Sequence, residues 1–448
     1  MVVFAKNVYE IGLTYMLIQF SVENYRSIKE EQTLTMVKDS PDEMSLNYCD
    51  PEVLTVPKLL HSAVIYGANA SGKSNLLKAL MHMNLIIAKS YKKEINSAIL
   101  VEPFKFDKNF LSKATTFTIS FIKNKIRYDY SFSATSKIIT EEWLSAYPNG
   151  REQALFHRWI EEPINELKND NNLYSWKFSS KLKGKVNVWK ESTRSDQLFL
   201  STAVHLNSEF LKPVYEWFLD DLRVLDLDRI MNDFTMKSCL EDPGVKATVV
   251  ELLKQADIDL DDIQIETKKS TVEDLPTHIS DAFKKKYLEE YPETMDAYFV
   301  HLDNEGNKIL LSLEDQSDGT QKLFEYAAPL LDVLSNGYVF VIDELNKSLH
   351  PDIVRYIVKI FNSNINVKHA QLIFTTHETS ILRKDLLRRD QIWFCEKQKD
   401  KSTTLYPLTS FSPRKDREDI EESYLSGRYG GKPIVKPFSF EPLVYLKD

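Results

Sequence analysis

Cysteine is scarce in this chain of 448 residues, which contains only Cys49, Cys239 and Cys395. The three are far apart, odd in number and form no Cys-x-x-Cys pair, so the sequence indicates neither a disulfide framework nor a zinc site. Their scarcity fits a reducing compartment, and we expect a cytoplasmic location. No apolar run is long enough for a transmembrane helix, and Met1–Phe20 lacks the layout of a secretion signal, so we expect no membrane partner.

A basic excess is also lacking, because the formal net charge is −9. Net acidity argues against a protein that coats nucleic acid with its whole surface, but it leaves room for a local basic strip. The composition, 43% hydrophobic and 27% charged, is that of a soluble globular protein, and the length allows two or three compact units. The functional start is either Met1 or Met16, since a strand-like stretch begins at Leu17.

One stretch matches a phosphate-binding P-loop. Residues 67–74 read Gly-Ala-Asn-Ala-Ser-Gly-Lys-Ser, which fits the pattern G-x-x-x-x-G-K-[ST]. The apolar run Ala63–Tyr66 predicts a buried strand before the loop, and leucines at helical spacing between residues 75 and 87 predict a helix after it. A strand followed by the loop and a helix is the context that this motif requires.

The chemistry of a P-loop assigns a role to each of its polar positions. Gly67 and Gly72 let the backbone curl so that N–H groups point at phosphate oxygens, and we count Asn69 among the nucleotide contacts. Lys73 should reach the β- and γ-phosphates, and the Ser74 hydroxyl should ligate Mg²⁺. We therefore expect ATP and Mg²⁺ as cofactors.

Two carboxylates follow a second predicted buried strand, Tyr338–Ile342. Asp343 fits an aspartate that holds Mg²⁺, and Glu344 fits the base that polarises the attacking water in phosphoryl transfer. His377 ends the next predicted strand, residues 370–376, at the edge where open α/β sheets bind ligands. We predict that Glu344 is catalytic and that His377 senses the γ-phosphate.

The order of predicted elements divides the α/β chain into three parts. We expect an N-terminal ATPase lobe with a mixed sheet at residues 16–149, a mainly helical insertion at 150–309, and a parallel-sheet ATPase lobe at 310–448. Within the insertion, the basic stretch Lys177–Arg194 and the tryptophans Trp176 and Trp189 admit two interpretations. The stretch either contacts phosphates while the indoles stack on bases, or it is a solvated face, which we favour.

A further short motif, Ser-Asp-Gly-Thr at residues 317–320, precedes a predicted helix, and on spacing alone it is a helix cap. The order of all these pieces, however, resembles the ABC-type ATPase heads of the SMC and RecF group. More narrowly, it resembles the prokaryotic anti-phage ATPases of the AbiLi/RloA type, which are related to the Septu and PARIS ATPases. The stretches that carry this resemblance are residues 20–27, 67–74, 317–320, 341–351, 374–377, 389–394 and 427–430.

This resemblance implies further site residues. Ser317 and Gly319 take the place of the signature motif, which acts across a dimer on the ATP of the other subunit. His377 takes the place of the switch histidine, and residues 348–350 that of the D-loop. Arg26 lies where related heads place a basic residue near the nucleotide.

The chain departs from the pattern of its relatives at three points. The signature is not the Leu-Ser-Gly-Gly of transporters, and Asn346 stands where many relatives have an acid. No clear Q-loop glutamine follows the P-loop, and the segment at Glu102 is the nearest candidate.

By resemblance, the protein is an ATPase that acts as a homodimer or higher homo-oligomer, senses infection and controls a separate effector protein in abortive infection. The alternative is a RecF- or SMC-like ATP-dependent DNA clamp in repair or recombination, so nucleic acid stays open as a partner. A fused nuclease of the overcoming-lysogenization-defect type is disfavoured. Only about 70 residues follow His377, and they hold no spare carboxylate cluster.

Overall fold

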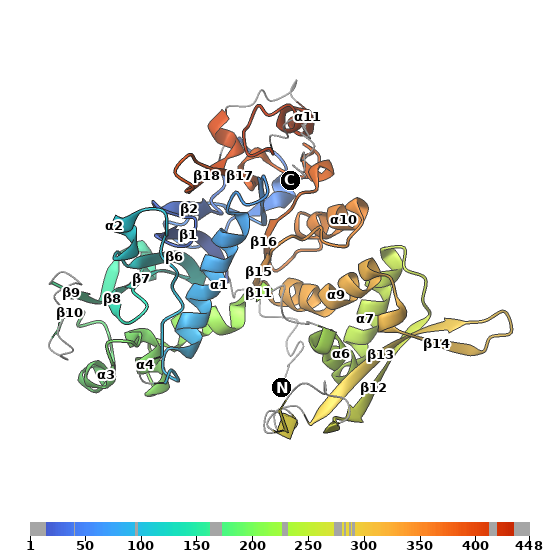
Figure 1. Cartoon of the computed structure of the whole chain (residues 1–448), viewed down its shortest axis with the longest axis horizontal. Coiled ribbons are helices and arrows are strands. Elements are labelled where there is room, and N and C mark those ends of the chain that lie inside the picture. The colour runs from blue at the N-terminus through green and yellow to red at the C-terminus, as the bar shows by residue number, and fades with distance from the viewer. Residues whose placement is uncertain are drawn as a thin grey trace, which may run out of the picture.

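A computed structural model of the chain places its elements in two large sheets with helices around them (Figure 1). Residues 1–14 and 434–448, which hold the uncertain start and the end of the expected C-terminal lobe, lie outside the described residues. The residues that the structure describes are 15–39, 41–94, 97–161, 173–225, 232–272, 280–281, 284–285, 288, 292–411 and 419–433.

The first sheet is antiparallel, with seven strands in the order β10-β9-β8-β7-β6-β1-β2. Its strands alternate side chains between a hydroxyl-rich face, where Thr118 pairs with Ser131, and an aromatic face, where Phe117 lies opposite Phe132. The strands are β1 (Leu17–Glu23), β2 (Gln32–Thr35), β6 (Thr115–Lys123), β7 (Ile126–Ala134), β8 (Ile139–Ala146), β9 (Gln153–Ile160) and β10 (Tyr174–Phe178).

The second sheet has six strands in the order β11-β15-β16-β5-β17-β18, parallel except for the last. Its apolar strands are buried on both faces: Ala63 and Ile65 belong to one hydrophobic core, and Val64 and Tyr66 belong to the other. The strands are β5 (Ser62–Gly67), β11 (Leu222–Leu225), β15 (Val339–Ile342), β16 (Gln371–Thr375), β17 (Ile392–Lys397) and β18 (Thr403–Pro407).

Three long helices cover this second sheet. Helix α1 (Lys73–Lys89) contacts β5 and also β1 and β6 of the first sheet, so it joins the two sheets into one core. Helices α9 (Asp318–Asn336) and α10 (Pro351–Phe361) pack into the core on the opposite face, to the right of α1 in Figure 1. Helix α9 is capped at its C-terminus by Gly337, whose φ of 77° lies in the left-handed region that favours glycine.

Residues 150–309 contain strands as well as the helices that the sequence predicts. Strands β9 and β10 extend the first sheet, and the predicted boundary at residue 150 falls between β8 and β9, which pair directly. Because strands on both sides of residue 150 belong to one sheet, the sheet itself marks no boundary there, and the three-part division of the chain stays a prediction. Besides β11 of the second sheet, the structure describes in this region α3 (Val186–Ser192), α4 (Phe199–His205), α5 (Lys212–Glu216), α6 (Asn232–Glu241), α7 (Pro243–Gln255) and the three-stranded sheet β12 (Asp262–Lys269), β13 (Glu293–Leu302) and β14 (Lys308–Ser312).

These layers confirm the expected α/β fold, with the P-loop between a parallel strand and a helix. Within the described ranges, no helix has both the length and the apolar character needed to cross a membrane. The smaller elements are the two-stranded sheet β3 (Tyr48–Cys49) and β4 (Leu59–Leu60), and helices α2 (Lys108–Leu111) and α11 (Ile420–Leu425).

Candidate nucleotide-binding site

The P-loop connects β5 to α1 at the carboxyl edge of the parallel sheet, and its glycines are sterically required. Gly72 has a φ of 110°, and a Cβ there would lie 2.1 Å from the Thr403 hydroxyl. A Cβ at Gly67 would lie 2.5 Å from the carbonyl oxygen of Cys395. Strands β17 and β18 approach the loop so closely that neither position can carry a side chain without displacing them.

The Lys73 ammonium lies over the loop and donates hydrogen bonds to the carbonyl oxygens of Gly67 (2.7 Å) and Ala68 (3.2 Å). Burial lowers the pKa of Lys73, while the carboxylates of Asp343 and Glu344 act in the opposite direction. The cation of the P-loop therefore lies close enough to the two acids after β15 to be affected by their charges.

Thr375, the last residue of β16, holds the two acids in place. Its hydroxyl donates to the Asp343 carboxylate (2.5 Å) and accepts a hydrogen bond from the Glu344 backbone N–H (2.7 Å). Glu344 has a φ of 53°, a left-handed conformation that is uncommon for a residue with a side chain and is frequent at functional sites. The backbone is thus turned sharply where the acidic pair leaves the strand.

Asn346 positions the segment that carries His377. Its side-chain oxygen accepts hydrogen bonds from the Thr376 hydroxyl (2.8 Å) and from the His377 backbone N–H (3.1 Å). The His377 side chain is exposed, and its pKa is lowered by partial burial and by the Lys73 charge. Asparagine thus provides the acceptor that a carboxylate would provide, without adding a third negative charge beside Asp343 and Glu344.

Arg26 is held by Glu102, not by the P-loop. Its guanidinium donates to Glu102 Oε1 through Nη2 (2.5 Å) and Nε (3.1 Å), and its backbone N–H donates to the Glu102 carbonyl (2.7 Å). The hydrogen bond from Arg26 is the main reason that the pKa of Glu102 is lowered. The residue that the sequence offers as the nearest Q-loop candidate is therefore the direct partner of Arg26.

A network of hydroxyl groups from Ser27 and Thr403 contacts the P-loop, and the sequence analysis did not predict it. The Thr403 hydroxyl donates to the Ser71 carbonyl (2.8 Å) and is hydrogen-bonded to Ser27 (2.8 Å), which also accepts from the Asn75 amide (2.7 Å). Ser27 lies in a stretch that carries the family resemblance, but no local signal in the sequence indicates Thr403.

Ser317 and Gly319 line a surface cavity away from the P-loop. Ser317 caps α9 by accepting from the Thr320 N–H (3.2 Å), and a Cβ at Gly319 would lie 2.9 Å from the Ser348 carbonyl. The cavity has a volume of about 600 Å³, and none of the residues that line it belongs to the P-loop. Within one chain, the structure brings together Lys73, Asp343, Glu344 and His377 and leaves Ser317 and Gly319 apart.

The tryptophans near the basic stretch are structural. Trp189 is only 2% exposed, and its indole N–H donates to the Leu206 carbonyl (3.3 Å), so its ring is not available to stack on a base. Trp176 packs against Phe178 and Phe199. The base-stacking interpretation is wrong for Trp189, because the ring is part of the core. The five lysines of the stretch are exposed, which fits a solvated face: Lys177, Lys181, Lys183, Lys185 and Lys190.

The hydroxyl network predicts a defect when one of its members is removed. Thr403→Val keeps the side-chain shape but leaves the Ser71 carbonyl without its donor, and an unsatisfied buried group costs about 1–3 kcal/mol. We expect ATP affinity to fall about tenfold, measured by calorimetric titration. Thr403→Ser should retain most of the affinity. Thr404→Val, at the neighbouring half-buried position, is the matched control, and an equal loss in that variant would contradict the role of the network.

Comparisons with solved structures find low-level likenesses over most of the chain. An SMC head bound to the C-winged helix domain of ScpA is 12% identical with a TM-score of 0.41, covering 87% of this chain and 97% of that one. The SMC head domain from Thermotoga maritima is 10% identical with a TM-score of 0.35, covering 87% and 98%. RecF with bound ATP is 14% identical with a TM-score of 0.37, covering 89% and 100%. At these values the likeness carries no functional argument, and no curated relative matches the sequence.

A family model does match. The family described as "AAA domain, putative AbiEii toxin, Type IV TA system" matches residues 62–383. The match begins with the first residue of β5, includes the P-loop, the Ser317 motif and the acidic pair, and ends after His377. It covers more than half of the chain, and the chain therefore belongs to this AAA-domain family.

Proposed function

We propose that this protein binds ATP with Mg²⁺ and hydrolyses it to ADP and phosphate. One observation carries the proposal: Lys73, Asp343, Glu344 and His377, which follow three adjacent parallel strands, act electrostatically on one another at a single edge of the sheet. Such an edge is where open α/β sheets bind their ligands.

The residues present suit both cofactors. The backbone at Gly67 and Gly72, where a Cβ has no room, offers N–H groups at a helix N-terminus to the phosphates, and Lys73 offers the cation. Ser74 and Asp343 provide the oxygen ligands that Mg²⁺ prefers. When bound, the ion neutralises charge on the phosphates.

The roles of the remaining groups follow from their positions. Glu344 would orient and polarise the attacking water, because phosphoryl transfer depends mostly on positioning and charge stabilisation. His377 is exposed at the same edge and has a lowered pKa, so it would approach the γ-phosphate as a neutral hydrogen-bond donor. Arg26 would act near the nucleotide only after leaving Glu102.

Substitutions at the two charged positions should separate binding from hydrolysis. Lys73→Ala should abolish ATP binding, because the cation over the loop is lost. Glu344→Gln should keep binding and slow turnover by about 10²–10⁴-fold, the usual contribution of a general base. Affinity and steady-state turnover are the measurements, with Lys78→Ala on α1 and Glu251→Gln on α7 as matched controls. Normal turnover in Glu344→Gln would remove this residue from catalysis.

We further propose that the active unit is a homodimer in which Ser317 and Gly319 contact the ATP of the other copy. Two observations support this. The cavity that holds both residues contains no P-loop residue, and it is open at the surface beside the exposed Ser348. A composite site of this kind requires a symmetric pair of chains.

Mixing two inactive variants tests the composite site. In a mixed dimer of Lys73→Ala with Ser317→Arg, one of the two sites keeps both Lys73 and Ser317. About half of the dimers in an equal mixture are mixed, so activity should return to at most about a quarter of the wild-type value. Lys73→Ala mixed with the double variant should restore nothing and serves as the control. No recovery in dimers that are shown to be mixed would argue for hydrolysis within one chain.

We propose that the biological output is anti-phage defence of the AbiLi/RloA type, in which the nucleotide state controls a separate effector. The family description, which names an AbiEii toxin and a toxin–antitoxin system, supports a defence role. Strand β14 supports a protein partner, since it exposes three consecutive large apolar side chains, Ile309, Leu310 and Leu311. The acidic turn around Asp257, beside the Ser317 cavity, is a second candidate contact.

Expression of this chain alone and with its neighbouring open reading frames tests that output. We expect phage protection to require both Glu344 and a second protein, and the purified chain not to cut DNA, RNA or tRNA with Mg²⁺ or Mn²⁺. Glu344→Gln in the same operon is the matched variant. Protection by the lone chain, or Glu344-independent cleavage, would refute the proposal and favour a self-sufficient nuclease.

A further inference from the structure

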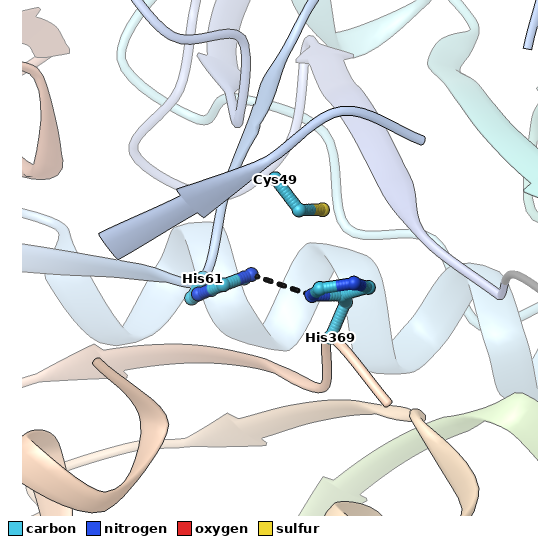
Figure 2. A group of neighbouring side chains, drawn as sticks. All are labelled: Cys49, His61 and His369. Atoms are coloured by element: carbon cyan, nitrogen blue, oxygen red, sulfur yellow. Dashed lines mark hydrogen bonds between the residues drawn. The ribbon is translucent and has the colours of Figure 1, made fainter. Parts of the chain in front are cut away.

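Three potential metal ligands that are far apart in the sequence meet at the opposite edge of the parallel sheet. They are Cys49 on β3, His61 directly before β5, and His369 two residues before β16 (Figure 2). One ligand atom from each lies within 4.8 Å of the other two, and Cys49 and His61 are buried. The group has no part in the proposed ATP site, which lies at the carboxyl ends of the same strands.

The orientation of His61 is that of a metal ligand. Its Nδ1 is hydrogen-bonded to the carbonyl oxygen of Leu46 (2.9 Å), which assigns the proton to Nδ1 and directs the lone pair of Nε2 toward His369. Metal-binding histidines usually donate their second ring nitrogen to a carbonyl or carboxylate in this way. The His61 backbone is also fixed, because its carbonyl accepts from the Leu372 N–H of β16 (2.8 Å).

The spacing of the two imidazoles suits a shared ion. His61 Nε2 and His369 Nδ1 are 3.2 Å apart. Two nitrogens bound to tetrahedral zinc at about 2.0–2.1 Å lie about 3.3 Å from each other. The present N–H···N hydrogen bond can therefore be exchanged for two metal bonds with little movement, once His369 carries its proton on Nε2. Figure 2 shows the Cys49 side chain on one side of this pair.

Burial shifts the pKa of each of the three side chains toward its neutral form. Burial lowers the pKa of His61 to about 4, and it lowers the pKa of His369, so both rings are neutral near pH 7. Burial raises the pKa of Cys49 to about 12, so an ion must displace the thiol proton to bind. The Met16 thioether lies 3.7 Å from the Cys49 sulfur as a further soft donor.

We propose that Cys49, His61 and His369 form a binding site for a transition-metal ion that prefers thiolate and imidazole, with Zn²⁺ as the expected occupant and Cu⁺ as the alternative of the same chemistry. The Cys/His ligand set suits zinc, and a thiolate with a nearby thioether also suits Cu⁺. The ion would tie the β3–β4 sheet to the amino ends of β5 and β16. No zinc pattern is visible in the sequence, because the ligands are separated by 12 and 308 positions instead of forming a short motif.

Metal titration of the full chain without nucleotide tests the site. The protein is stripped with a chelator under reducing conditions, incubated with Zn²⁺ and desalted, and its metal content and midpoint of thermal unfolding are measured. We expect about one Zn²⁺ per chain and a higher midpoint. Cys49→Ser and His369→Asn should lose both effects. Cys239→Ser, which removes another buried cysteine, is the matched control and should keep them.

Two further measurements keep the test decisive if a variant fails to fold. Co²⁺ in the wild-type protein should give thiolate-to-metal charge-transfer absorption, and affinity should rise with pH by up to about tenfold per unit, because one thiol proton is released. Displacement of Zn²⁺ by Cu⁺ under anaerobic conditions would support the site and assign copper. Three results would overturn the proposal: no charge-transfer band, an equal rise of the unfolding midpoint with Mg²⁺, or retention of Zn²⁺ by Cys49→Ser and His369→Asn when both are folded. The group would then be a neutral histidine pair beside a buried thiol.

Discussion

The parallel register of β15, β16 and β5 is the constraint on which the candidate site depends. Ile342 lies opposite Phe374, and Thr375 lies opposite Ile65, so the residues that follow all three strands emerge at one edge. Alternate residues of each strand enter different cores, and a one-residue slip would exchange every side chain between them. The same burial that stabilises the sheet therefore places Asp343 and Glu344 beside the P-loop and His377.

The shape of the P-loop is fixed by segments far from it in the chain. Strand β18 provides Thr403, which occupies the space that a side chain at position 72 would need and bonds the loop backbone at Ser71. The turn after β1 provides Ser27, which joins Thr403 to α1 through Asn75. Both large sheets thus contact the loop, and a change in their relative position would be transmitted to it directly. These contacts support the proposed link between nucleotide state and a protein partner.

Local patterns in the sequence predicted the strands and helices around the candidate site, because these elements depend on residues that are close together in the chain. The strand and helix around the P-loop and the strand before Asp343 are close to the predicted bounds, because the periodic spacing of apolar residues indicates them. Contacts between residues that are far apart in the chain could not be predicted from these local patterns. Nothing near Thr403 indicates that it supports a loop 332 positions away, and the Trp189 ring is buried although basic, exposed residues surround it.

The two histidines of the proposed metal site and the nucleotide edge lie at opposite ends of the same strands, and this separation limits what an ion can do. Strand β5 has six residues and β16 has five, so at about 3.3 Å per residue the two sites are roughly 16–20 Å apart. That distance is too long for the ion to touch a phosphate. An ion bound by Cys49, His61 and His369 can therefore act only through the strands. Its effect would be on the stability of their amino ends, and hence on the rigidity of the frame that carries Lys73 and His377.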